Sequence, residues 1–432
     1  SHVKTDQLSA AFHLTGTVNH FLAATPILIA TGLEYRYEKA SKDVDPRLGT
    51  GEMIGFNEEI GYTGSFNVQE AFAEVGIPLL ANKPFFHKLD FTGGVRLSHY
   101  STAGNVLAWR AGLNWKIIEG LRLRGEFQRA VRAPSIHELY RKSAESFPDF
   151  IDPYAGSTGE VRSFCHDLGV ADVSVIRTGS HQVSSFSSGN IELQEEVSNT
   201  YTAGLLWNPA AISNLIISAD YYDISLNNSI SPPSPTDVAN LCIASRDKNS
   251  LHCQAIQRDS KGIVTRIDRQ YDNLLINRRT GIDLEINFGF KLEEIGFKPN
   301  SGSIDMRLMG GWILSSEDQA SQNAPLIDCA GYVDDALCGR AIPEFKSIFW
   351  LTYKQKNLQT TLRWRWLSKL TDGILLHDPT AQPVIPHVAP YHYFDLLGNY
   401  KVSHNLEVYG GIRNLTDKQP PLIESEVGAG TD

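Results

Sequence analysis

The sequence lacks a long uninterrupted run of apolar residues. A membrane-spanning helix needs roughly 18–20 of them, and no segment of the 432 residues approaches that length. Positive charge is not in excess either, because 39 Lys and Arg face 49 Asp and Glu and the formal net charge is −10. Binding to nucleic-acid phosphates needs clustered Lys and Arg, whereas the basic residues here occur singly. These absences exclude a helical membrane protein and predict that nucleic acid is not a partner.

Cysteine is scarce, and the five cysteines are placed unevenly. Cys242 and Cys253 lie in one polar connector, Cys329 and Cys338 lie in another, and Cys165 stands apart. Each pair would close a small loop as a disulfide, which is typical of an oxidising compartment. Metal binding is the alternative interpretation, but neither pair has C-x-x-C spacing. We therefore predict two local disulfides.

Signatures of catalysis are also missing. The sequence contains neither a phosphate-binding P-loop nor a G-x-S-x-G nucleophile motif. His137-Glu138 resembles the start of a zinc-protease helix, but Arg141 occupies the position of the second histidine. The 13 histidines are otherwise scattered. We expect no enzymatic activity, no cofactor and no metal site.

What the sequence does contain is alternation between apolar and polar residues. In the segment 121–128, Leu121, Leu123 and Phe127 alternate with charged or amide residues. Successive side chains of a β-strand point to opposite faces, so each such segment predicts a strand with one apolar and one polar face. We predict about fourteen strands. They cover residues 9–21, 27–38, 64–78, 88–100, 106–116, 121–131, 198–207, 214–227, 275–291, 302–314, 345–354, 357–367, 391–401 and 405–415.

The polar face of these strands carries charge that a soluble β-sandwich would have to leave in solvent. In a transmembrane barrel the same face would line a wet lumen, while the apolar face meets lipid. These charged residues are our candidates for contact with a ligand, although for any one of them a solvated wall is the simpler interpretation. The candidates are Arg96, Arg110, Arg122, Arg124, Glu126, Asp283, Glu285, Arg307, Arg363 and Arg365.

The connectors between the predicted strands alternate in length. Up-and-down strands place every second connector on the same rim, and the long connectors at 39–63, 132–197, 228–274, 315–344 and 368–390 all fall in alternate positions. Only 101–105 is a short connector in a long position. Short turns on one rim and long loops on the other are typical of bacterial outer-membrane barrels. The sequence therefore predicts an all-β, antiparallel, up-and-down transmembrane β-barrel.

Four sequence strings stand in a characteristic order on this pattern. They are Val131-Arg-Ala-Pro-Ser-Ile-His-Glu-Leu-Tyr140, the stretch from Gly189 to Pro209, Asp220-Tyr-Tyr-Asp-Ile224, and Gly411-Ile-Arg-Asn-Leu-Thr-Asp-Lys-Gln-Pro-Pro421. Together they resemble the β-barrel of TonB-dependent outer-membrane receptors, most clearly from residue 64 onward. The prolines and the Asn and Asp residues of these strings end strands, so we interpret the strings as structural signals that end a strand and begin a loop.

The resemblance implies a barrel of about 22 strands with a plug in its lumen. Residues 1–432 would then be a partial barrel that lacks the plug domain, the TonB-contacting box and the last strand. Partners implied by the resemblance are the TonB complex through the missing N-terminal plug, outer-membrane lipid, and a small-molecule or oligosaccharide ligand. Related receptors often carry a cysteine where Tyr154 follows Asp152-Pro153 here, which leaves Cys165 without its usual partner.

Three functions remain open from sequence alone. The leading hypothesis is uptake of a scarce nutrient, such as a siderophore-like compound, cobalamin or an oligosaccharide, across the bacterial outer membrane with energy from TonB. A passive pore or adhesin without a plug is the alternative. An outer-membrane enzyme is a third possibility, but it would need a cluster of Ser or Asp with His that we do not find.

Overall fold

The structure, a computed structural model, describes residues 1–19, 26–170, 172–319, 325–333, 338, 341–377 and 379–421. Fourteen strands follow one another in one antiparallel sheet, in the order β1-β2-β3-β4-β5-β6-β11-β12-β15-β16-β19-β20-β23-β24. Their bounds are β1 His2–Val18, β2 Ile27–Asp43, β3 Tyr62–Lys83, β4 Phe86–Tyr100, β5 Gly104–Ile118, β6 Leu121–Arg132, β11 Glu196–Trp207, β12 Leu215–Ser231, β15 Asp272–Lys291, β16 Ser303–Gln319, β19 Phe345–Gln355, β20 Leu358–Leu367, β23 Tyr391–Lys401 and β24 Glu407–Ile412.

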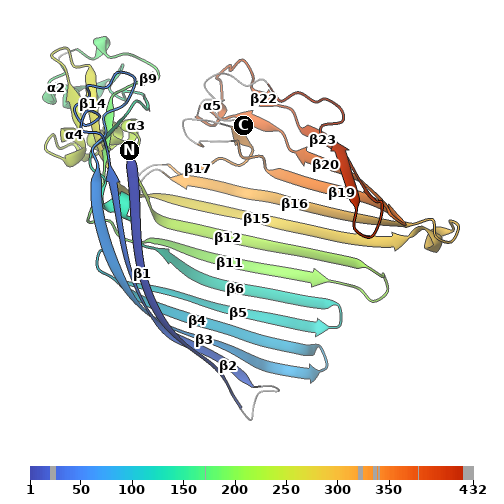
Figure 1. The fold of residues 1–432 in the computed structure, drawn as a ribbon. Coiled ribbons are helices and arrows are strands. Elements are labelled where there is room, and N and C mark those ends of the chain that lie inside the picture. Colours follow the sequence, from blue (N-terminus) through green and yellow to red (C-terminus); the bar gives the residue numbers. More distant parts are fainter. Residues whose placement is uncertain are drawn as a thin grey trace.

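All fourteen predicted strands are therefore present, and each neighbour in sequence among them is a neighbour in the sheet. The sheet curves into a deep trough whose open side lies between β1 and β24 (Figure 1). Among the described residues, β1 pairs only with β2 and β24 only with β23, so these two strands form the edges. The end of the first predicted strand, residues 20 and 21, lies outside the described residues.

Several strands continue beyond their predicted ends at the rim that carries the long loops. β2 runs on to Asp43 and β16 to Gln319, where the prediction stopped at residues 38 and 314. These extensions read Lys-Ala-Ser-Lys-Asp and Ser-Ser-Glu-Asp-Gln, with little apolar alternation. A strand above the lipid layer has no face that must be apolar, so its pattern disappears although its hydrogen bonding continues.

The two longest connectors fold together into what we call the loop domain, residues 133–195 and 232–271. Its main sheet has the order β13-β14-β10-β7 and so combines strands from both connectors. A second pair, β8 with β9, and the helices complete it (Figure 1). The elements are α1 Ile136–Tyr140, β7 Ala144–Ser146, β8 Asp149–Phe150, α2 Gly159–Asp167, β9 His181–Gln182, β10 Ser185–Ser188, α3 Pro235–Ser245, α4 Leu251–Gln254, β13 Ile256–Arg258 and β14 Val264–Gln270.

The loop domain has an apolar core of its own. Phe150, Val238 and Ile267 are buried in one cluster, and Tyr154 and Phe164 in another beside it. A smaller group of loops at the same rim contains β18 Tyr332–Val333, β21 Leu370–Asp372 and β22 His387–Val388 in one sheet. The sequence predicted these connectors as loops and gave them no structure, because their apolar residues follow no regular period.

Candidate functional site on the inner face of the sheet

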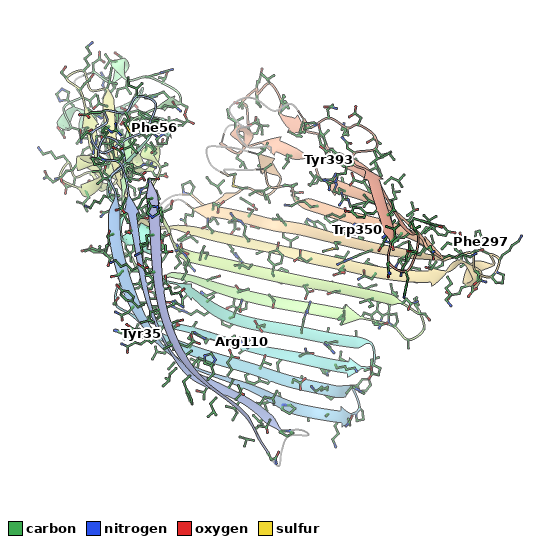
Figure 2. All side chains as sticks on the ribbon, in the orientation of Figure 1. Tyr35, Phe56, Arg110, Phe297, Trp350 and Tyr393 are labelled. Atoms are coloured by element: carbon green, nitrogen blue, oxygen red, sulfur yellow. A yellow bond between two sulfur atoms is a disulfide. The ribbon has the colours of Figure 1, made fainter. Side chains whose placement is uncertain are left out.

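The strand register places all ten charged candidates on one face of the sheet. Directly paired residues of neighbouring antiparallel strands share a face, so one face can be followed from strand to strand through such pairs. Gly94 pairs with Arg110, Arg110 with Gln128, Gly204 with both Arg124 and Asp220, and Asp220 with Asp283. The same series continues through Arg307–Trp350, Trp350–Arg363 and Arg363–Asp395. We call this surface the inner face, because Arg110 points into the trough while Tyr35 lies on its convex side (Figure 2).

In the first strands the inner-face charges form lateral ion pairs. The Arg96 guanidinium lies 3.1 Å from a carboxylate oxygen of Glu34 and 3.3 Å from one of Glu70, so it joins β2, β3 and β4. Arg110 lies 3.3 Å from Glu74 in the same manner. Such pairs between neighbouring strands hold the register and satisfy the charges, but the exposed ones add little stability individually.

The middle strands carry an inner-face ion pair with two hydrogen bonds. Arg124 donates from Nε and Nη2 to the two oxygens of Asp220, at 2.7 and 2.6 Å. This two-bonded geometry suits a planar guanidinium. Of the remaining candidates on these strands, Arg122, Glu126 and Asp283 have no ion-pair partner among the described residues. Of the ten candidates, these three are the most free to meet another molecule.

The last strands add aromatic rings to the charges. Arg307 lies 3.0 Å from Glu285 and over the ring of Trp350, with 5.6 Å to its centroid. Arg365 lies over the Tyr393 ring at 5.2 Å; both rings are labelled in Figure 2. Arginine on an aromatic face keeps its outer N–H groups available as donors.

Asp395 fixes the rim end of the last strands. Its carboxylate is fully buried, although it belongs to the inner-face row. It accepts hydrogen bonds from Arg363 Nε at 2.7 Å and from the backbone N–H of Asn414 at 2.8 Å. Asn414 itself has a positive φ of 51°. The Asn-Leu-Thr-Asp string therefore turns the chain over a buried ion pair, in agreement with its interpretation as a structural signal that ends a strand.

The opposite, outer face is apolar and exposed. Leu33 retains 62% of its accessible surface and Trp312 retains 52%, although both lie in the middle of long strands. Leu97 and Leu113 are similarly exposed. A continuous exposed apolar face of this extent is the surface that lipid covers in a membrane barrel.

The Arg-Ala-Pro-Ser string also has a structural role. Pro134 follows the end of β6, and Ser135 caps α1 in a capping box with Glu138. His137 accepts from Arg141 Nη1 at 3.4 Å and lies 3.0 Å from the hydroxyl of Tyr62. Burial, followed by the charges of Arg141 and Lys42, lowers the pKa of His137.

Both predicted disulfides are present, as Cys242–Cys253 and Cys329–Cys338. Cys165 is a free, fully buried thiol in the cluster that contains Tyr154 and Cys242. Burial raises the pKa of Cys165, so the thiol is unreactive at neutral pH.

Two features are absent from the described residues. No group of three or more His, Cys, Asp or Glu side chains there is arranged to hold a metal ion. None of the helices in that part of the chain is both long and apolar enough to cross a membrane.

An up-and-down sheet with an exposed apolar outer face, a charged inner face and all long loops on one rim is the wall of an outer-membrane β-barrel. The sequence matches the family described as TonB dependent receptor-like, beta-barrel, over residues 2–415. The chain belongs to this family, and its location is the bacterial outer membrane.

Solved structures have the same fold. A ferric enterobactin receptor mutant from Pseudomonas aeruginosa, in complex with enterobactin, superposes with a TM-score of 0.61 at 16% identity, covering 96% of this chain and 49% of that one. The siderophore receptor PirA from Acinetobacter baumannii gives 0.60 at 12% identity, with 96% and 51% covered. This chain thus spans about half the length of these receptors. A comparison with curated proteins found no match.

Proposed function

We propose that residues 1–432 form most of the barrel wall of a receptor that takes up a scarce nutrient across the outer membrane. Membership in the receptor family carries this proposal. The solved structures with this fold include siderophore receptors and a copper transporter, which supports import of a small solute as the function. The complete receptor would contain, in addition, a plug domain that contacts TonB.

In this proposal the work is binding and gating, without bond chemistry. The loop domain would capture the solute at the outer rim, since loops held by a rigid scaffold supply specificity. The inner-face charges would then contact the plug and the solute in a water-filled lumen. Arg122, Glu126 and Asp283 are the best candidates for these contacts, because their charges are not neutralised by a neighbouring strand.

Uptake by the complete receptor tests the proposal. We would express the receptor in a Gram-negative host without competing receptors and measure uptake of a radiolabelled ferric catecholate, cobalamin and a maltooligosaccharide, with and without TonB. Saturable uptake of one of them that disappears without TonB is the expected result. Uptake that is equal without TonB, or that is not saturable, would support the passive pore instead.

A further inference from the structure

Two half-buried arginines, one at the end of α1 and one near the end of β14, have no carboxylate partner among the described residues. Arg141 caps the end of α1, and Arg269 lies near the end of β14. Among the described residues, the Nε atoms of both side chains are buried without a hydrogen-bond partner. The backbone places the two residues on neighbouring segments, because the Gly189 N–H donates to the Arg141 carbonyl oxygen at 2.7 Å and Ser187, two residues earlier, is paired with Arg269. Burial, followed by the charge of Arg141, lowers the pKa of Arg269.

Other half-buried arginines nearby are neutralised. Arg132 pairs with Glu138 and Glu196, and Arg258 pairs with Asp152 at 2.8 Å. Carboxylates of the same loops therefore pair with these arginines, whereas none of the described residues supplies a carboxylate to Arg141 or Arg269. Burial of an uncompensated charge is costly, which makes the exception informative.

Neutral groups hold the Arg269 guanidinium in place. Nη1 donates to the carbonyl oxygen of Pro233 at 3.2 Å, and Nη2 donates to Ser146 Oγ at 3.2 Å. These contacts orient the guanidinium group and leave its positive charge without a compensating negative charge. Arg141 is oriented similarly by His137 Nε2 at 3.4 Å. An oxyanion binds well to two guanidinium groups that neutral partners already hold in position.

Arg141, at the end of α1, lies over the inner face at the rim of the barrel. α1 packs on that face, since the Tyr140 ring covers Gly64 of β3, and a Cβ at Gly64 would lie 2.1 Å from the ring. Gly64 belongs to the inner-face row through its register with Ala40. A solute that enters between the loops and the wall would pass this place.

We propose that Arg141 and Arg269 form a binding site for an oxyanion, a phosphate or carboxylate group. The oxyanion is supplied either by a solute or by a carboxylate side chain of a segment outside residues 1–432. This proposal goes beyond the uptake function, because the site would bind an oxyanion whichever nutrient the receptor imports.

Inorganic phosphate is the probe, and the complete receptor in detergent micelles is the protein. Calorimetric titration at constant ionic strength, with chloride as the exchanged anion, should show saturable phosphate binding. Arg269→Gln and Arg141→Gln should each weaken it at least about tenfold, because each removes a charged guanidinium group. Arg266→Gln is the matched control. It lies on the same strand but is paired with Asp268 at 2.8 Å, and should change the affinity less than about twofold.

A second measurement does not depend on the folding of the variants. In the wild-type receptor, phosphate should slow the modification of Arg141 and Arg269 by phenylglyoxal, as mapped by mass spectrometry, without slowing that of Arg266. If a carboxylate of the protein fills the site, phosphate will not bind, and Arg269→Lys treated with a carbodiimide will form an amide to that carboxylate. Absence of phosphate binding, of protection and of this cross-link together would overturn the proposal.

Discussion

Arg132 and Glu196 close the longest loop of the protein with two hydrogen bonds. Arg132 donates from Nε and Nη2 to the two carboxylate oxygens of Glu196, both at 2.6 Å, and the residues are direct partners where β6 meets β11. The Glu196 carboxylate is buried and also accepts from the backbone N–H of Ile230 at 2.7 Å. It therefore joins the base of both long connectors that form the loop domain.

Glu196→Gln should loosen this base. The amide cannot accept from the guanidinium and the Ile230 N–H in the same way, and we expect a loss of about 1–3 kcal/mol in the local stability of the loops, since the Arg132 side chain is partly exposed. Limited proteolysis should cut within residues 133–195 faster than in the wild type, while the barrel strands stay intact. Glu195→Gln, one residue earlier and without an ion-pair partner among the described residues, serves as control. Equal cleavage rates in the two variants would contradict the role of Glu196.

Gly204 leaves the space that the Arg124–Asp220 pair occupies. A Cβ at Gly204 would lie 1.9 Å from Asp220 Oδ1 and 2.8 Å from Arg124 Nε. Gly204→Ala should therefore displace the pair and destabilise the folded barrel by about 1–3 kcal/mol, as overpacking does. The measurement is the temperature at which the folded band disappears on unboiled gels.

Gly125→Ala is the matched control for Gly204→Ala. It lies on the neighbouring strand, but its nearest atom, the Thr202 carbonyl oxygen, would be 3.7 Å from the new Cβ. This variant should melt within about 0.5 kcal/mol of the wild type, as is usual for unstrained surface changes. Similar melting of both variants would show that Arg124 and Asp220 can move aside without cost.

The fold was more predictable than the site. Each strand that crosses the lipid must alternate, so segments such as 121–128 revealed all fourteen strands and the face of each charged residue. Contacts that depend on register could not be predicted, because Arg363 and Asp395 are 32 residues apart and meet only after β20 pairs with β23. The loop domain was also missed, since its core combines Phe150 with Val238 from a different connector.

Acid should weaken the docking of α1 on the barrel. Burial opposes ionisation of Glu138, but hydrogen bonds from Arg132 and Ser135 lower its pKa on balance, and burial first of all lowers the pKa of His137. Both groups thus bind protons more weakly in the docked helix than in a released one. Docking is fully stable above the ordinary His pKa of about 6.5 and is lost progressively as the pH falls below it.

Hydrogen exchange of the α1 amides, corrected for the intrinsic effect of pH, measures this loss between pH 7 and pH 4. His137→Gln removes the upper part of the transition, so that the decline should begin only near the ordinary Glu pKa of about 4.3. The charged and titratable groups that face His137 and Glu138 are Arg132 of β6, Tyr62 of β3, Lys42 of β2, Glu59 of the following loop, Tyr271 and Arg141. Protection of α1 that stays constant down to pH 4 would contradict the assignment.

The two faces of β5 should respond oppositely to a new positive charge. Leu113 lies on the outer face with half of its surface exposed, and Asn114, the next residue, lies on the inner face opposite Arg124. In lipid, Leu113→Arg should cost about 2–4 kcal/mol if the residue lies near the bilayer midplane, because the charge is removed from water. Asn114→Arg should cost less than half of that, since it enters a wet lumen. Folding yield into lipid vesicles and the melting temperature of the folded band measure both variants, and equal losses would show that the outer face is not covered by lipid.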